Sequence, residues 1–251
     1  MADRGGEPGL WWLALAAGLL PAIAAIVAFQ LAVAQGQFPP CAPLLDGCVS
    51  ISRAGRHELP NILFRALLLP GATLQGIVWL LSGAWLHRLG VRRDRMLTLL
   101  PWLGVTAAVA LVLYGTFLGT EGAGYRWMRR YGVVVYFGFT CIALLIVAGA
   151  LRSTRVDPRL RPGAMGLHAL VMALPLLGLA NAGSPLYLVD RHARDALENI
   201  SEWWGALLFT ISFFLLAWLW WRTGFAANLH LAQEFRVGER SAGCSCDNQT
   251  H

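Results

Sequence analysis

Long runs of apolar residues alternate with short polar segments along the whole chain. The runs cover residues 10–34, 62–87, 96–118, 131–151, 163–183 and 203–221. A helix rises about 1.5 Å per residue, so about 18 or more apolar residues cross a hydrocarbon layer about 30 Å thick. The pattern predicts an all-α, polytopic membrane bundle of six transmembrane helices within residues 1–225. We expect residues 226–251 to form a polar, disordered cytoplasmic tail.

The first apolar run has to be distinguished from a cleaved signal peptide. Its end contains Ala32-Val33-Ala34, which resembles a signal-peptidase site. However, the run is longer than the apolar core of a signal peptide, which has about 7–15 residues. The residues before the run carry Asp3 and Glu7 beside a single Arg4. We therefore favour a retained helix, with cleavage as the alternative.

Prolines and single polar residues interrupt several runs. The prolines are Pro21, Pro70, Pro101 and Pro175. A proline removes one backbone N–H, but in a membrane bundle neighbouring helices satisfy the freed carbonyl, so we expect kinks rather than breaks. We also expect Gln30, Gln75 and His168, which lie within runs, to form hydrogen bonds between helices.

Composition agrees with a membrane protein: 57% of the 251 residues are hydrophobic and 14% are charged. A soluble domain is usually about one quarter charged, because polar side chains must cover its surface. All 20 basic residues are arginine, and with abundant alanine, glycine and leucine this usage is typical of a GC-rich bacterial genome. The net charge of +6 does not indicate a nucleic-acid partner, because the arginines lie in short loops between the runs.

The distribution of arginine predicts the orientation of the bundle. Twelve arginines lie in the two terminal segments and in the loops after the second and fourth runs, whereas seven lie in the other three loops. The side richer in arginine faces the cytoplasm, which places both termini there. We expect a multi-pass protein of a bacterial cytoplasmic (inner) membrane, surrounded by membrane lipids as partners. The sequence leaves its oligomeric state open.

Cysteine usage fits this orientation. Cys41 and Cys48 flank a short turn in the first loop, which arginine counting places outside, where disulfides persist. We expect a disulfide between them, with two unpaired thiols as the alternative. Cys244, Cys246 and His251 are too few ligands for a closed zinc site, so we predict no metal. The sequence contains no haem, flavin or nucleotide motif, and we expect no cofactor.

Charged side chains close to the predicted outer boundary are the candidate binding residues. At about 100° per residue, five polar residues before and at the start of the last run share one helical face. They are His192, Asp195, Glu198, Asn199 and Glu202. This face is either a solvated helix end or an interior-facing polar site. Arginine forks suit phosphate, so we expect a lipid-headgroup site. Its candidate residues are Arg65, Arg129, Arg130, Asp195, Glu198 and Glu202.

A catalytic reading rests on fewer residues. His57 beside Glu58 is a candidate acid–base pair, and Ser50 or Ser52 a candidate nucleophile. Neither serine lies in a G-x-S-x-G elbow, and polar loops contain such residues without any catalytic role. Whether the protein is an enzyme is left open.

Three short motifs resemble one known family. The run from Ser50 to Arg65, SISRAGRHELPNILFR, is similar to the first outer loop and second helix of the FRAG/DRAM/SFK family of six-span membrane proteins. Its matching positions are Ser52, Gly55, Pro60 and Phe64, and Arg65 fits the branch that remodels GPI-anchor lipids. Glu202-Trp203 resembles the acidic–aromatic pair that begins the last helix, and Arg130-Tyr131-Gly132 the turn into the fourth. The chain has Arg53 and Asn61 where the family often has acidic residues.

The resemblance implies a function in lipid handling. Members of the family are implicated in lipid remodelling of GPI anchors, in autophagy-linked lysosomal membranes and in plasma-membrane lipid organisation. We therefore expect a lipid-remodelling or lipid-organising protein with a headgroup site on its outer face. A non-enzymatic membrane sensor or scaffold is the first alternative, and a small-solute transporter is the second.

Overall fold

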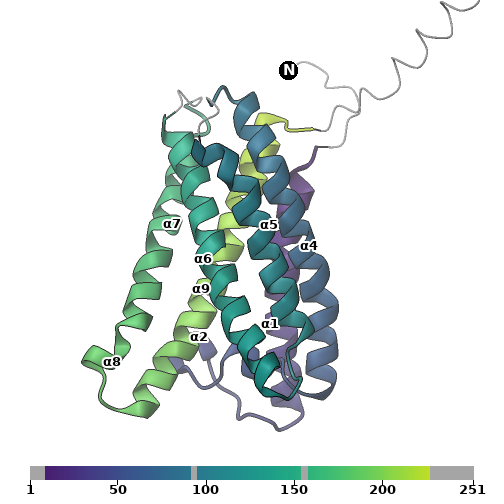
Figure 1. The fold of residues 1–251 in the computed structure, drawn as a ribbon, viewed down its shortest axis with the longest axis vertical. Helices are drawn as coiled ribbons and strands as arrows, with labels where there is room; N and C mark the ends of the chain where they lie inside the picture. Colours follow the sequence, from purple (N-terminus) through teal and green to yellow (C-terminus); the bar gives the residue numbers. More distant parts are fainter. Residues whose placement is uncertain (1–8, 92–94, 154–157, 227–251) are drawn as a thin grey trace, which may run out of the picture.

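The computed structural model describes residues 9–91, 95–153 and 158–226. Its six long helices are α1 (Trp11–Ala34), α4 (Glu58–Arg88), α5 (Arg95–Thr116), α6 (Ala123–Ser153), α7 (Arg161–Ala182) and α9 (Arg191–Thr223). Three short helices lie between them, α2 (Pro43–Asp46), α3 (Ile51–Ala54) and α8 (Ser184–Tyr187). The described residues contain no strand, only an isolated bridge between Gly9 and Ala226. The structure confirms the predicted all-α bundle with six candidate membrane spans (Figure 1).

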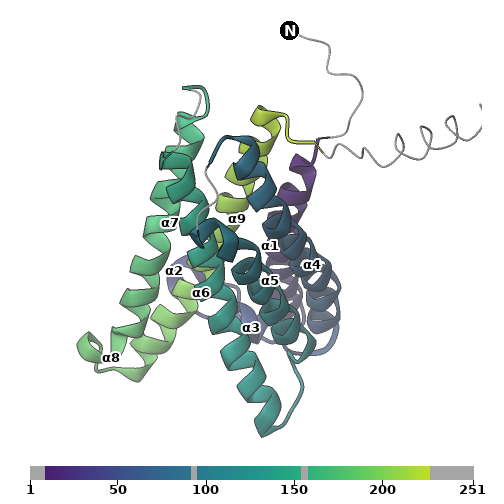
Figure 2. The ribbon, with the colours of Figure 1, turned by 45° about the horizontal axis from the view of Figure 1, so that its top comes forward.

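The six long helices form a ring in chain order. Helix α1 packs on α4, α4 on α5, α5 on α6, α6 on α7, and α7 on α9, which returns to pack on α1. Helices α6 and α9 are not closely packed on each other, although each contacts α7. Figures 1 and 2 show the same arrangement from two directions, with α7 at one edge of the bundle.

The bundle has two ends of different construction. The disulfide end carries residues 35–57, 117–122 and 183–190, including α2, α3 and α8. The termini end carries residues 9–10, 89–91, 158–160 and 224–226, and both ends of the described chain meet there. Of the predicted polar tail, residues 226–251, all but Ala226 lie outside the described residues.

Three helices continue well beyond the apolar runs. Helix α4 begins at Glu58, α6 at Ala123 and α9 at Arg191, whereas the corresponding runs begin at residues 62, 131 and 203. Hydropathy marks only the part of a helix that matches the hydrocarbon layer, and backbone hydrogen bonds carry the helix past that layer. At about 1.5 Å per residue these helices are about 46–50 Å long, more than the thickness of a hydrocarbon core.

All four intramembrane prolines lie inside continuous helices, as predicted. Pro21 has no N–H for the carbonyl of Ala17, one turn earlier. Gln75 Nε2 from α4 donates to this carbonyl oxygen at 3.1 Å, which confirms the predicted interhelical role of Gln75. His168 is also bonded between helices, with Nε2 2.8 Å from Arg152 Nη1. Gln30 is exposed, and no hydrogen bond of its side chain is found in the described part of the chain.

Small residues let the helices approach closely. A Cβ added at Gly104 of α5 would lie 2.1 Å from the Trp79 side chain of α4, which is fully buried. A Cβ at Gly71 of α4 would lie 2.8 Å from the ring of Pro21 in α1. Close approach through small residues is typical of membrane bundles, where apolar burial alone does not drive helices together.

The outer surface of the bundle is apolar. Large hydrophobic side chains face outward from every long helix, for example Ile26 at 54%, Leu80 at 56% and Leu176 at 66% exposed. Such a surface is unfavourable in water and suits lipid chains. With six apolar helices of spanning length, the chain is a multi-pass integral membrane protein.

Candidate functional site

The first loop of the disulfide end is held against α9. Cys41 and Cys48 are joined by a disulfide, which closes the turn that contains α2. Gly47 in this turn has a φ of 60°, and a Cβ there would lie 2.3 Å from the carbonyl oxygen of Ala196 in α9. Only glycine combines that backbone conformation with so close a contact.

Polar side chains of α9 bind the backbone of the same loop. Asn199 Nδ2 donates to Gly47 O at 2.7 Å, and Trp203 Nε1 donates to Val49 O at 2.9 Å. Trp204 Nε1 donates to Leu44 O at 3.1 Å. In the opposite direction, Ser52 N donates to the carboxyl oxygen Oε1 of Glu202 at 3.2 Å. These bonds fix α3 over the middle of the bundle.

Helix α4 holds the other side of α3. Asn61 Nδ2 donates to Gly55 O at 2.8 Å and to Leu118 O at 3.1 Å, so one amide joins the two loops of the disulfide end. A Cβ at Gly55 would lie 3.0 Å from the ring of Phe64, which is 2% exposed. Phe64 therefore packs directly beneath the end of α3.

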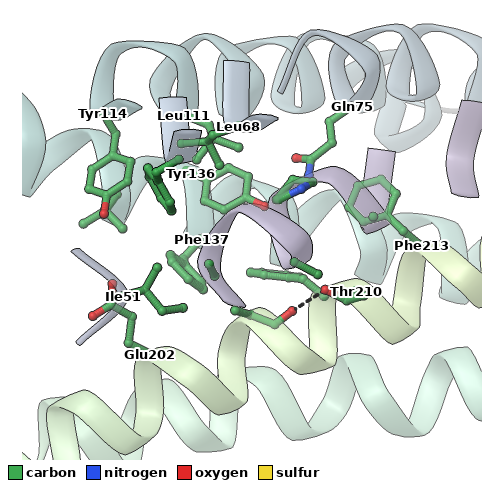
Figure 3. Close-up of a pocket in the computed structure, with 18 residues that line it drawn as sticks. Ile51, Leu68, Gln75, Leu111, Tyr114, Tyr136, Phe137, Glu202, Thr210 and Phe213 are labelled. Atoms are coloured by element: carbon green, nitrogen blue, oxygen red, sulfur yellow. Dashed lines mark hydrogen bonds between the residues drawn. The ribbon is translucent and has the colours of Figure 1, made fainter. Parts of the chain in front are cut away.

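A cavity lies inward of α3, between the long helices, and Figure 3 shows the residues that line it. Its volume is about 70 Å³, and the wider empty space that includes its open mouth is about 610 Å³. This is room for more than one water molecule, each of which needs about 10–15 Å³ by the same measure. Residues of α1, α3, α4, α5, α6 and α9 line the cavity. Most of them are apolar, and the polar ones are Gln75, Tyr114, Tyr136, Glu202 and Thr210.

Polar groups gather at the end of the cavity nearest α3. Figure 3 shows Ile51, Glu202 and Tyr114 at this end. The Tyr114 hydroxyl lies beside the Ser52 side chain. It is also close enough to interact electrostatically with the charged groups of Glu202, Arg56 and Arg129. We call this group of five residues, Ser52, Arg56, Tyr114, Arg129 and Glu202, the polar cluster.

Both arginines of the polar cluster retain unused donors. Arg129 Nη1 donates to Phe117 O at 3.0 Å and to Thr120 O, which holds the guanidinium against the α5–α6 loop. A guanidinium carries five N–H donors, so most of those of Arg129 remain available. The Nε atom of Arg56 is buried and has no hydrogen-bond partner among the described residues. The cluster can therefore donate to an anionic group and accept through Glu202.

The opposite end of the cavity is less polar. Gln75 and Phe213 lie there in Figure 3, with the hydroxyl of Tyr136 between Gln75 and the polar cluster. Thr210 Oγ1 donates to Ala206 O in its own helix at 2.8 Å, so its hydroxyl proton is already used. Between the two ends the walls are formed by alanine, leucine and aromatic side chains.

Aromatic rings separate the cavity from the gap between α6 and α9. The ring of Phe209 in α9 lies 5.2 Å from that of Phe137 and 5.9 Å from that of Tyr136, both in α6. Because the backbones of α6 and α9 are not closely packed, these side chains form the contact between the two helices. Helix α7 packs on both α6 and α9, and none of its residues lines the cavity.

The residues predicted for headgroup binding have separate locations. Glu202 lines the cavity, and Arg129 belongs to the polar cluster beside it. The other four candidates are not among the lining residues. Arg130, Asp195 and Glu198 are exposed, and Arg65 is half-buried on α4. The predicted acidic face of α9 thus has two parts, because His192, Asp195 and Glu198 are exposed while Asn199 and Glu202 turn towards the first loop.

The candidate acid–base pair lies away from the cavity, whereas the candidate nucleophile Ser52 belongs to the polar cluster. His57 and Glu58 are exposed where α4 begins, and neither lines the cavity. Ser50 is 9% exposed, and its hydroxyl accepts from Arg53 N as the cap of α3. The Ser50 and Ser52 hydroxyls are 3.1 Å apart. No cluster of histidine, cysteine, aspartate or glutamate suited to a metal ion occurs among the described residues.

Two cavity residues were not identified from sequence. Tyr114 and Tyr136 lie within apolar runs, where a tyrosine cannot be told from any other core aromatic residue. Their hydroxyls are recognised as part of the site only through neighbours that are distant in the chain. These neighbours are Ser52 for Tyr114 and Gln75 for Tyr136. The nearest available signal was the polar residue Gln75 inside an apolar run, which marks a helix face turned inward.

Comparison with known proteins identifies the family. The structure defines a multi-pass integral membrane protein with a central cavity. The family model described as the Frag1/DRAM/Sfk1/Cwh43P N-terminal domain matches residues 9–221, so the chain belongs to this family. The branch that remodels GPI-anchor lipids stays a prediction. No curated protein and no solved structure matches the chain.

Two of the three motifs that resemble the family meet at the cavity. Ser52 of the first motif is bonded through its backbone N–H to Glu202 of the second. Phe64 and Glu202 both line the cavity, and Trp203 holds the loop through Val49 O. The motifs are therefore parts of a single structure, the closed polar end of the cavity.

Proposed function

We propose that this protein binds a phosphate-bearing lipid, with the headgroup at the polar cluster and one chain in the cavity. The observation that carries the proposal is the meeting of the two family motifs at the polar end of an otherwise apolar cavity. An amphipathic space of this kind matches a ligand with a polar head and an apolar chain.

The polar cluster supplies the chemistry for a headgroup. Arg56 and Arg129 have unused N–H donors, and guanidinium groups bind phosphate oxygens through paired hydrogen bonds. Glu202 retains acceptor capacity beyond its bond from Ser52 N, which suits a hydroxyl or ammonium group of the same headgroup. A headgroup that carries both a phosphate and a hydroxyl or ammonium group would pair with the arginine donors and with the Glu202 carboxylate at once.

The disulfide end is the side that we assign to the exterior. Arginine counting places it outside, and the disulfide between Cys41 and Cys48 lies at this end. The lipid is then drawn from the outer leaflet.

Lipid analysis of purified protein tests the proposal. We expect wild-type protein to retain a phosphate-bearing lipid through purification, and Glu202→Gln to reduce its amount at least about tenfold, because a carboxylate is a stronger acceptor than an amide. Glu198→Gln is the matched control, since Glu198 lies one turn away on α9 but is exposed and outside the cavity. Equal lipid content in the two folded variants would exclude the polar cluster as the headgroup site.

A further inference from the structure

The inner end of the cavity contains a buried amide whose orientation is fixed. Gln75 is 2% exposed, and its Nε2 donates to Ala17 O, the carbonyl that Pro21 leaves without a partner. Because an acceptor lies on that side, the NH₂ group must face α1. The carbonyl oxygen Oε1 faces away from α1 and has no hydrogen-bond partner within the described residues.

Tyr136 lies beside this amide but does not complete its hydrogen bonding. Its hydroxyl is next to the Gln75 side chain, as Figure 3 shows. A phenol has one proton to donate, whereas an amide oxygen accepts two hydrogen bonds and the phenol oxygen accepts others. Even when Tyr136 donates to Gln75, the pair can accept more hydrogen bonds than it can donate. An apolar chain alone leaves these acceptors unpaired inside the membrane, which is unfavourable.

The pair lies deep below the polar cluster. Helix α4 contributes Phe64 at the polar end and Gln75 at the inner end, about 16 Å apart at about 1.5 Å per residue. Helix α9 contributes Glu202 and Phe213 over the same rise. A group that meets Gln75 therefore belongs to the chain of a lipid whose headgroup lies at Glu202.

We infer that the ligand is a lipid whose apolar chain carries a hydroxyl group, and that this hydroxyl donates its proton to Gln75 Oε1 and accepts from the Tyr136 hydroxyl. The inference rests on the proposed function, because the headgroup at the polar cluster sets the depth of the chain. The inference adds that the protein distinguishes between lipids that have the same headgroup but different chains. A plain acyl chain has no donor at this depth, whereas a chain hydroxylated near its middle has one.

Competition between two matched lipids tests the inference. Ricinoleate is oleate with one added hydroxyl near the middle of the chain. The full-length protein is equilibrated in micelles with equimolar dioleoyl and diricinoleoyl phosphatidylglycerol, and native mass spectrometry measures which lipid it retains. We expect wild-type protein to favour the ricinoleoyl lipid about fivefold, as one added hydrogen bond permits.

Substitutions of the pair separate this selection from binding as a whole. Gln75→Leu should bring the ratio to about one, and Tyr136→Phe, which keeps the ring, should reduce it about twofold. Ser82→Ala is the control, because Ser82 is a buried hydroxyl of α4 that bonds Val78 O of its own helix and lies outside the cavity. The control should keep the fivefold preference.

Each remaining outcome has a distinct meaning. Equal retention of the two lipids by wild-type protein would overturn the inference and leave the proposed function standing. A preference that persists in both Gln75→Leu and Tyr136→Phe would also overturn it, since the selection would then lie elsewhere. Glu202→Gln should lower retention of both lipids without changing their ratio. Retention of neither lipid by wild-type protein would overturn the proposed function itself.

Discussion

The two ends of the bundle are closed by similar contacts that produce different results. At the termini end, Trp85 Nε1 donates to Thr223 Oγ1 at 3.0 Å and Arg88 Nη1 donates to Ala226 O at 2.8 Å. The Arg88 guanidinium also lies 5.2 Å from the centre of the Phe225 ring. At the disulfide end, Trp203 and Glu202 also bind loop backbone, but these bonds hold α3 above the cavity.

The difference lies in what the closing residues cover. Trp85 packs on Trp220, with ring centres 6.2 Å apart, and Trp220 packs on Phe225 at 4.9 Å, so aromatic rings fill the termini end. The disulfide end instead places polar groups, Tyr114 and Glu202 among them, at the edge of empty space. Loop fixation alone does not indicate a site, whereas loop fixation over a cavity with unpaired polar groups does.

Substitution of glycine should distinguish the two ends most strongly. Gly47 and Gly90 both have positive φ, at 60° and 81°, but a Cβ at Gly90 would meet nothing within 4 Å. We expect Gly90→Ala to lower the free energy of unfolding by about 1 kcal/mol, the backbone penalty alone. Gly47→Ala should lower it by about 3 kcal/mol or more, because the methyl group also displaces the loop from Ala196. Titration with SDS measures both, and equal losses would contradict close docking of the loop.

Removal of the disulfide should have the next largest effect. The double variant Cys41→Ser/Cys48→Ser should lose about 2 kcal/mol of stability, because the unfolded chain gains freedom. Lipid retention should fall with it, since the same loop carries Ser52. Cys141→Ser, at the free and half-buried cysteine of α6, is the control. It should change the stability by less than about 0.5 kcal/mol and the lipid retention by less than about twofold. Thermal unfolding with and without reductant, beside lipid analysis, checks this prediction.

Tryptophan substitutions at the two ends should separate stability from binding. Trp203→Phe and Trp85→Phe each remove one indole hydrogen bond, and each should cost about 1 kcal/mol. Only Trp203→Phe should reduce lipid retention, because Val49 O and the adjoining α3 lie over the cavity. A comparable loss of lipid in Trp85→Phe would show that lipid content follows stability and not the disulfide end.

Exposed charges at the disulfide end should have the smallest effect. Arg130 and Asp195 belong to the predicted headgroup residues but lie outside the cavity. Arg130→Gln and Asp195→Asn should change lipid retention less than about twofold, since exposed charges contribute little. Arg129→Gln, at the adjacent arginine held against the α5–α6 loop, should reduce retention by at least about fivefold. Equal effects of Arg129→Gln and Arg130→Gln would move the headgroup site to the exposed surface.

The sequence predicts the spans well and the site only in part. Six runs of sufficient length predict six helices, because the thickness of the hydrocarbon layer fixes how long an apolar run must be. The helix ends were less predictable, as α6 begins at Ala123 and not near residue 131, since polar residues outside the layer also form helix. A polar group in lipid needs a partner, which predicts that Gln30, Gln75 and His168 bond between helices. Gln75 and His168 do, whereas Gln30 is exposed.

The site depends on contacts that no local pattern contains. Periodicity placed Asp195, Glu198 and Glu202 on one face of a helix, but only the position of the first loop turns Glu202 inward and leaves the other two exposed. Tyr114 and Tyr136 belong to the cavity because α4, α5, α6 and α9 surround one space. Such packing arises from the whole ring of helices, so a single run cannot reveal it.

Filling the cavity tests the central claim most directly. Ala206 lines the cavity between Glu202 and Phe209, whereas Ala169 is exposed on α7, so Ala206→Trp and Ala169→Trp add the same group inside and outside it. Native mass spectrometry of the purified proteins counts retained lipids. The account predicts one retained phosphate-bearing lipid in wild type and Ala169→Trp, and none in Ala206→Trp. Equal lipid retention in all three folded proteins would contradict it.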